Sequence, residues 1–517
     1  MNNLKKIDTV QINKLVTSVN KILENIKNNL DKHEWKYIFL TLCFLKIINK
    51  IIEKNNQFSI NWRKNFTYNW NFIVSSAKNN DHNIATIIDK TLFMFESENS
   101  TFLNKAKLWK KFALIFKNQQ ANLIKIVLEI EASTIFEIIY DNEENKDNFD
   151  ILAHIYEKFL NQYGKWEKRK SGKFYTPISI VKLMANILSL YFKDLKLEKE
   201  WLNIYDPTVG SGGMFIQGLK IFDELKGSKY FYGQEKDFNA CQFGKINLSL
   251  YNINFELKTN DTITAPCEDF PEYMDLVLSN PPFNAKKTNE YLDIPEINGE
   301  NIVTKYNLAN DSTLNFYFMC HIIEKLSTNG KGGILLDLNS ATTPASHEAR
   351  KSIINKDVVD IIIKLPNKIF TNTNINALLY ILNKNKTITK DKILFINAEK
   401  EFKTKNNIVY LGKQNIKNIL SYVEDYLNNN HHKFPVYENA DIATIEDIKK
   451  NNYNLKIEKY IPLTPEEEID SSKYKDITNN LKKKIDDVNM QLNSFQSKFN
   501  QIKNLEEFIN KIKNQNK

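Results

Sequence analysis

The chain has 517 residues, enough for two or three domains with substantial cores. Its hydrophobic content of 42% and charged content of 26% are ordinary for a globular protein, so the chain should fold. A net charge of +9 makes nucleic acid a plausible partner, but arginine, the usual reader of guanine edges, occurs only at positions 63, 169 and 350. The charge therefore favours phosphate contacts over base recognition.

The cysteines indicate neither a disulfide framework nor a zinc site. All four are far apart, no CxxC pair occurs, and the 7 histidines do not alternate with them at metal-ligand spacing. We therefore expect no metal and a reducing cytoplasm. The N-terminus lacks a signal-peptide pattern, and the most apolar stretch, 37–52, is short and contains Lys46 and Lys50. It predicts a core helix and no membrane contact.

Residues 1–163 predict an all-α N-terminal domain. This segment contains no glycine and no proline, and its apolar residues recur at helical spacing, as at Phe39, Leu42, Leu45 and Ile48. Six to eight helices are expected, with the tryptophans in their core. The basic segment 163–173 that follows indicates an interdomain loop, either solvated or in contact with phosphates.

From Trp201 onward the pattern alternates between strand, loop and helix. The apolar runs are 202–205, 230–233, 274–278, 333–338, 358–365 and 377–382. Their alternation with helical stretches predicts a doubly wound α/β sheet within a domain of residues 164–461. Ligands of such sheets bind at the carboxyl ends of the strands, so the loops at those ends are the candidate site.

A glycine turn follows the first predicted strand. Asp206 ends the strand, and Gly210, Ser211, Gly212 and Gly213 then open a helix. Without Cβ atoms the backbone can approach a ligand closely, and the helix N-terminus favours negative groups such as a carboxylate. The turn alone is weak evidence for a nucleotide site, and the absence of a following Lys-Ser/Thr pair disfavours a Walker phosphate loop.

Two acidic residues follow the next strands. Glu235 stands about twenty positions after the glycines, where a carboxylate accepts ribose hydroxyls in nucleotide-binding sheets. Asp261 follows the third strand candidate and is predicted either to hold an adenine ring or to cap a helix.

The loop Asn280, Pro281, Pro282 and Phe283 is suited to gripping a planar exocyclic amine. It follows an apolar strand that the prolines end. The Asn280 side-chain oxygen and the Pro281 carbonyl can each accept a hydrogen from an NH2 group, while Phe283 can stack on the ring that carries it. An adenine fits this description, and a glutamine amide also presents such an NH2. The alternative is a proline turn with its aromatic residue in the core.

Residues 462–517 predict a C-terminal helix for subunit assembly. No glycine or proline occurs from Glu466 to the end, and apolar residues are spaced alternately by four and three. They are Leu481, Ile485, Val488, Leu492, Phe495, Phe499 and Ile502. This heptad pattern is typical of a coiled coil or of a helix that buries its stripe on a partner, and packing on its own domain is the alternative.

The order of these motifs closely resembles the modification (M) subunit of type I restriction-modification systems. A helical domain, GKFYTP, DPTVGSGGMF, YGQE, NPPF and NNYNLKIEKYI follow one another as they do in that family of N6-adenine DNA methyltransferases. The resemblance covers most of the chain. It implies a Rossmann-like methyltransferase sheet and S-adenosylmethionine as methyl donor.

The resemblance also implies roles for individual residues. The family's first cofactor segment matches Lys173, Phe174, Tyr175, Thr176, Pro177 and Ile178. Asp206 and the glycine turn match its glycine loop, although Thr208-Val209 stands where Ala-Cys or Ala-Ala is frequent. Glu235 matches its ribose-binding acid, and the loop 280–283 matches its catalytic loop.

In this family the partners are double-stranded DNA, a specificity (S) subunit that reads its sequence, a second modification subunit and a restriction (R) subunit. The target adenine is flipped out of the duplex, because its amine cannot be approached in line within the stack. Lys286, Lys287 and the 165–173 loop are the first candidates for DNA contact. Two alternatives remain. One is a stand-alone methyltransferase for DNA, RNA or a protein amide, and the other is a catalytically silent DNA-binding assembly subunit.

Overall fold

The computed structural model describes most of the chain. The described ranges are 9–25, 32–53, 68–136, 176–192, 200–251, 253–291, 294–370, 375–405, 408–429, 439–461 and 478–496. The chain divides into two compact units, one of residues 1–434 and 439–460 and the other of residues 435–438 and 461–517. The finer boundaries at 163/164 and 461/462 stay predictions.

The N-terminal part of the first unit is helical, as its composition predicts. Its elements are α1 (Thr9–Glu24), α2 (Lys32–Glu53), α3 (Trp70–Lys78), α4 (Ile84–Glu98), α5 (Phe112–Ile115), α6 (Gln120–Ala132) and the 3-10 turn η1 (Thr134–Phe136). The periodic apolar residues Phe39, Leu42, Leu45 and Ile48 of α2 are all fully buried. Trp35 and Trp70 are buried as well, so the helical spacing identified the core of this part correctly.

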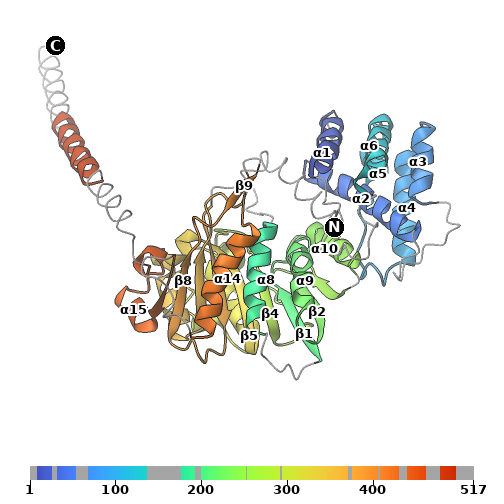
Figure 1. Ribbon diagram of the computed structural model, residues 1–517. Helices are drawn as coiled ribbons and strands as arrows, with labels where there is room; N and C mark the ends of the chain where they lie inside the picture. The colour runs from blue at the N-terminus through green and yellow to red at the C-terminus, as the bar shows by residue number, and fades with distance from the viewer. Residues whose placement is uncertain are drawn as a thin grey trace, which may run out of the picture. The chain divides into compact units, whose positions relative to one another are not determined.

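A nine-stranded sheet forms the rest of the unit (Figure 1). Its strands are β1 (Trp201–Asp206), β2 (Ser228–Gln234), β3 (Asn254–Lys258), β4 (Met274–Ser279), β5 (Leu326–Asp337), β6 (Val359–Lys364), β7 (Ala377–Asn383), β8 (Lys392–Asn397) and β11 (Ala440–Thr444), in the order 11-8-6-7-5-4-1-2-3. β9 (Lys403–Lys405) and β10 (Ile408–Tyr410) form a separate ribbon. β7 and β11 run antiparallel to their neighbours and the other strands are parallel.

Helices cover both faces of this sheet. They are α8 (Ile178–Leu190), α9 (Gly213–Asp223), α10 (Phe238–Ser249), α11 (Ile302–Lys305), α12 (Asn315–Lys325), α13 (His347–Asn355), α14 (Lys413–Leu427) and α15 (Ile445–Lys450), with 3-10 turns η4 (Asn289–Tyr291), η5 (Leu338–Ala341), η6 (Pro344–Ser346) and η8 (Ile457–Lys459). α8 lies between α9 and α14 on one face (Figure 1). α12 lies on the other face. Neighbouring residues of a strand point to opposite faces, and a Cβ on Gly333 would contact Met184 of α8 whereas a Cβ on Gly332 would contact Ile322 of α12.

The predicted doubly wound sheet is thus confirmed, with all six apolar runs in strands. β4, β6 and β7 are buried at every position, which explains why they appear in the sequence as continuous apolar runs. The antiparallel position of β7 between β5 and β6 was not predicted. A strand that is buried on both faces is a continuous apolar run whether it is parallel or antiparallel to its neighbours, so its sequence does not indicate its direction. The carboxyl ends of β1, β2, β3 and β4 point to the same edge of the sheet, where the candidate loops lie.

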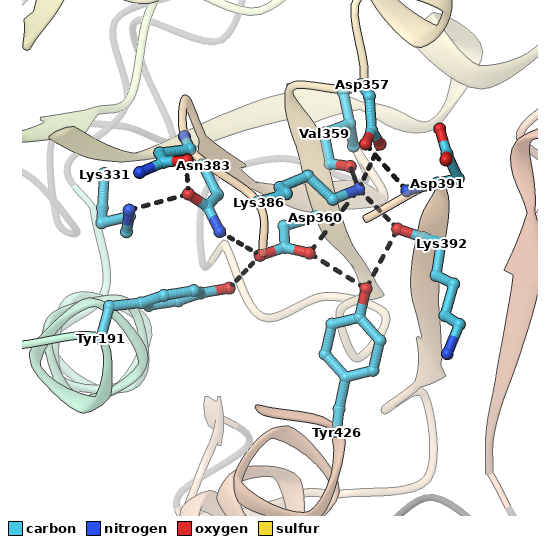
Figure 2. A network of polar contacts seen from close by, with 11 residues as sticks. Tyr191, Lys331, Asp357, Val359, Asp360, Asn383, Lys386, Asp391, Lys392 and Tyr426 are labelled. Carbon is cyan, nitrogen blue, oxygen red and sulfur yellow. Dashed lines mark hydrogen bonds and ion pairs between the residues drawn. The ribbon is translucent and has the colours of Figure 1, made fainter. Parts of the chain in front are cut away.

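A buried polar network fastens the opposite edge of the sheet (Figure 2). Asp360, near the start of β6, is fully buried, and its carboxylate accepts hydrogen bonds from Tyr191 at 2.9 Å, Asn383 at 2.8 Å and Tyr426 at 3.0 Å. The ammonium of Lys386 lies 3.8 Å from the same carboxylate. These bonds join the end of α8, β7 and α14 to β6, so the network is structural and lies far from the candidate loops.

In the part of the chain that the structure describes, no helix is long and apolar enough to cross a membrane.

Candidate active site

The predicted glycine turn follows β1 and contains two glycines with positive φ angles. Gly210 and Gly212 have φ angles of +54° and +77°, in the region that favours glycine. A Cβ on Gly212 would lie 2.9 Å from Cγ of Leu248, so a side chain has no room there. Gly213 then begins α9, and the carbonyl of Ser211 accepts a hydrogen bond from Asn247 Nδ2 at 3.0 Å. The turn therefore presents bare backbone at the edge of the sheet.

Asp206 is the last residue of β1, directly before this turn, and is 1% exposed. Its Oδ1 accepts the N–H of Thr208 at 2.9 Å, whereas its Oδ2 has no hydrogen-bond partner among the described residues. Burial raises the pKa of this carboxyl to about 7, although the hydrogen bonds from Thr208 oppose the shift. A buried carboxylate oxygen without a partner is costly, so Asp206 is a candidate for contact with a cationic ligand.

Glu235 joins the turn to the end of β2. Its Oε2 accepts the N–H of Gly210 at 3.1 Å and its Oε1 accepts the N–H of Asp237 at 2.9 Å. The acid predicted from the twenty-residue spacing is thus brought directly to the glycine turn.

Asp261 follows β3, which ends three residues earlier at Lys258. Its Oδ1 accepts the N–H groups of Ile263 and Thr264 in a turn, so it does not cap a helix. Its Oδ2 accepts the Tyr291 hydroxyl at 3.1 Å and lies 3.1 Å from Lys236 Nζ. Burial alone would raise the pKa of Asp261, but the N–H donors and Lys236 outweigh it and the pKa is lowered. A contact of Asp261 with adenine stays a prediction.

Asn280 stands directly after β4 with its amide held in one orientation. Its Nδ2 donates a hydrogen bond of 2.7 Å to Thr176 Oγ1, and its Oδ1 is buried without a hydrogen-bond partner among the residues described. Since a buried acceptor without a donor costs about 1–3 kcal/mol, the geometry leaves one oxygen ready for an incoming N–H. Pro281 is buried and Pro282 half-buried in the loop that follows.

Phe283 is 6% exposed and belongs to the hydrophobic core of the sheet domain. Its ring meets that of Phe370 edge to face, with centroids 5.2 Å apart. Phe283 thus packs in the core of the free chain, and stacking of its ring on a base stays a prediction.

The first cofactor segment is described only in part. Thr176 is buried against Asn280, Pro177 is the N-cap of α8 and Ile178 is its first residue. Lys173, Phe174 and Tyr175, with the 165–173 loop, lie outside the described residues.

Lys286 and Lys287, the two lysines predicted to contact DNA, come shortly after the loop 280–283 in the sequence. The backbone of Lys286 forms an isolated antiparallel β-bridge with that of Thr313. Lys287 Nζ donates a hydrogen bond to the carbonyl of Ala309 at 3.3 Å and lies over the ring of Tyr317. Among the described residues, no group of three or more His, Cys, Asp or Glu side chains is arranged to hold a metal ion.

Sequence reasoning missed two contacts of the site. Thr176 touches Asn280 across 104 residues of sequence, a pairing that no local pattern carries. Phe370 could have been found, because it follows the predicted strand 358–365 at the same sheet edge as the other loops.

A nucleotide-type glycine turn beside β1 and an amide oxygen presented after β4 define a methyltransferase sheet of the kind that acts on amino groups. The chain belongs to the N-6 DNA methylase family, whose model matches residues 147–469, more than half of the chain. Within that family it is a modification subunit of a type I restriction-modification system, an adenine-N6 DNA methyltransferase, as the motif order predicts.

Individual relatives agree. The HindI methylase subunit of Haemophilus influenzae is 31% identical over 342 residues, covering 64% of this chain and 73% of the relative. The MjaIX methylase subunit of Methanocaldococcus jannaschii is 26% identical and covers 90% and 88%. The type I methyltransferase subunit of Streptococcus thermophilus, a solved structure, has a TM-score of 0.67 at 20% identity and covers 88% and 100%, which shows the same fold.

Proposed function

We propose that the chain binds S-adenosylmethionine over the carboxyl ends of β1, β2 and β3 and methylates the N6 amine of an adenine held at the end of β4. The observation that carries the proposal is that two of the buried oxygens without a hydrogen-bond partner among the described residues, Asp206 Oδ2 and Asn280 Oδ1, belong to the loops at the carboxyl ends of β1 and β4. One suits the positive charge of the cofactor and the other suits the N–H of the base. The class of sheet also fits this cofactor.

Several residues would hold the cofactor. The backbone of the turn at Gly210 and Gly212 admits a ligand closely, Glu235 would accept ribose hydroxyls, and Asp261 would lie near the adenine ring. Thr176, Pro177 and Ile178, together with the preceding Lys173 to Tyr175, would line the same site. When bound, the cofactor supplies an electrophilic methyl group.

The catalytic work of the chain is orientation and charge stabilisation. Asn280 Oδ1 and the Pro281 carbonyl accept the two N6 hydrogens, so that the nitrogen lone pair points away from them towards the methyl group. Positive charge growing on N6 is stabilised by the same oxygens, and the methylated nitrogen becomes neutral again when it gives up one of its two protons to solvent. Thr176 prevents rotation of the Asn280 amide by accepting from its Nδ2, and Phe283 holds the base, with stacking worth roughly 1–3 kcal/mol.

Cofactor affinity should depend on pH through Asp206. Because burial raises its pKa to about 7, the carboxyl of the free protein is mostly protonated at pH 6, whereas a cationic cofactor favours the ionised form. Binding then releases a proton, and affinity rises as pH increases towards about 7 and levels off above it. With roughly a tenth of the carboxyl ionised at pH 6 and half at pH 7, the gain is about fivefold.

Calorimetric titration with S-adenosylmethionine in buffers of different ionisation heats measures this proton release. The variant Asp206→Asn should bind more weakly at pH 7 and show neither the release nor the rise. An equal pH dependence in that variant and in the natural chain would exclude Asp206 as the linked group.

The partners that we propose are double-stranded DNA, a specificity subunit, a second modification subunit and a restriction subunit. The relatives are subunits of type I restriction enzymes, which supports a multisubunit assembly. A DNA substrate and four free, buried cysteines favour the cytoplasm.

Transfer of labelled methyl from S-adenosylmethionine to DNA tests the proposal. We expect N6-methyladenine when the chain is mixed with its specificity subunit and little label when it is alone. Label from the chain alone would instead indicate a self-sufficient enzyme, and no label in either case would indicate another acceptor or a silent subunit.

A further inference from the structure

A chain of buried hydrogen bonds runs beneath the cofactor-binding ends of β1 and β2. The Tyr205 hydroxyl donates to Gln234 Oε1 at 2.8 Å and lies 3.1 Å from His321 Nε2 of α12. Gln234 Oε1 also accepts the N–H of Cys267 at 3.2 Å, and Gln234 Nε2 donates to the carbonyl of Ala265 at 3.2 Å. Tyr205, Gln234 and His321 are all fully buried.

The direction of these bonds is determined by what each group can donate. The Tyr205 hydroxyl has one hydrogen and gives it to Gln234, so His321 must donate to the hydroxyl from a protonated Nε2. Burial lowers the pKa of His321 to about 3, which keeps the ring neutral, and its Nδ1 has no partner among described residues. The Gln234 amide is therefore locked with its oxygen towards Tyr205 and its nitrogen towards Ala265.

Gln234 thereby fastens the turn 261–265 to the sheet. Within this turn the N–H of Ala265 donates to the Asp261 carbonyl at 2.8 Å. The hydroxyl of Thr262 donates to the carbonyl of Pro207, directly after Asp206. The turn is thus held between the end of β1 and the end of β2, and it carries Asp261 towards the cofactor side.

Two residues of this hydrogen-bonded chain, Tyr205 and Gln234, directly precede proposed cofactor ligands in the sequence. Asp206 follows Tyr205 and Glu235 follows Gln234. Because successive side chains of a strand point to opposite faces, the buried pair fixes the strand ends from one side while the two acids are presented from the other.

We propose that Gln234 is a positioning residue of the cofactor site, one that sets the spacing between the β1 and β2 ends and the turn that carries Asp261. This inference rests on the proposed function. Gln234 does not touch the cofactor; it acts through the backbone at Ala265 and Cys267. Its loss should therefore weaken cofactor binding more than it slows the transfer of a bound methyl group.

The test uses the full chain with its specificity subunit and measures KM for S-adenosylmethionine, kcat and the thermal midpoint. Gln234→Met keeps the length of the side chain but removes its three hydrogen bonds, and we expect KM to rise about tenfold with kcat changed less than about twofold. Tyr205→Phe removes one of these three bonds, together with the bond from His321, while it keeps the ring, and it should raise KM by a smaller factor.

Tyr191→Phe is the control, because it removes a tyrosine hydrogen bond, to Asp360, at the opposite edge of the sheet. Tyr191 is half-buried, so the variant should lower the thermal midpoint less than Tyr205→Phe does, and KM should stay unchanged. An unchanged KM in both Gln234→Met and Tyr205→Phe, or the same rise in Tyr191→Phe, would overturn the inference. Failure of the natural chain to bind S-adenosylmethionine would instead refute the proposed function itself.

Discussion

Replacement of Asn280 by alanine is expected to reduce methyl transfer by about 10²–10³-fold while cofactor binding stays intact. The variant removes the only side-chain oxygen that the catalytic loop offers to the N6 hydrogens, and loss of a preorganised group of this kind costs about 10²–10³ in rate. It also leaves Thr176 Oγ1 without the donor that now binds it. The measurement is single-turnover transfer of labelled methyl to DNA in the presence of the specificity subunit.

A conservative variant separates chemistry from packing. Asn280→Asp keeps an oxygen that can accept from the N6 amine, and the Thr176 hydroxyl can turn to donate to its second oxygen. We therefore expect measurable transfer from Asn280→Asp but not from Asn280→Leu, which has a similar volume.

Asn383→Ala is the matched control, since it removes another buried asparagine whose Nδ2 donates to Asp360 at 2.8 Å, far from the site. It should lower stability and leave single-turnover transfer by the folded protein unchanged. Normal transfer by Asn280→Ala would remove Asn280 from the mechanism, and a parallel loss of cofactor binding would mean that the variant had lost its fold.

The sequence predicted those parts of the site that depend on local chemistry. The glycines indicated the turn that opens α9, and the apolar run before Asn280 placed that residue at a strand end. Strand ends meet at one edge in any parallel sheet, so Asp206, Glu235 and Asn280 could be grouped before their distances were known.

The sequence could not predict pairings between distant segments. Which residue holds the Asn280 amide depends on where the residues before α8 lie, and which groups bind Asp261 depends on where Tyr291 lies after the loop 280–283. The role of Gln234 is hidden for the same reason. In the sequence, Gln234 is only a polar residue next to Glu235. Its role follows from its hydrogen bond to the carbonyl of Ala265, which belongs to a turn 31 residues later in the chain.

Deletion from Ser471 onward is expected to abolish assembly with the specificity subunit and to leave cofactor binding unchanged. The described part of this segment is a helix over 478–496 whose residues are all exposed. The heptad positions Leu481, Ile485, Val488, Leu492 and Phe495 are 55%, 58%, 61%, 58% and 74% exposed. Phe499 and Ile502, which continue the predicted spacing, lie outside the described residues.

Such a stripe is costly in water and stabilising when buried, since each Leu, Ile, Val or Phe contributes roughly 1.5–3 kcal/mol on full burial. A single helix cannot bury its own stripe, so a second helix or a groove must cover it. We propose that the specificity subunit provides that surface. Co-purification of the two subunits, with and without the deletion, measures the effect.

Paired substitutions within the full chain give a sharper form of the same test. Ile485→Asn with Val488→Asn changes two stripe positions and should weaken association by roughly 3 kcal/mol or more, over 100-fold. Asp486→Asn with Asp487→Asn places the same residue type on the adjoining face of the same helix and should leave association nearly unchanged. If both pairs weaken assembly equally, charge or helix stability holds the subunits together, and if neither does, the specificity subunit binds elsewhere on the chain.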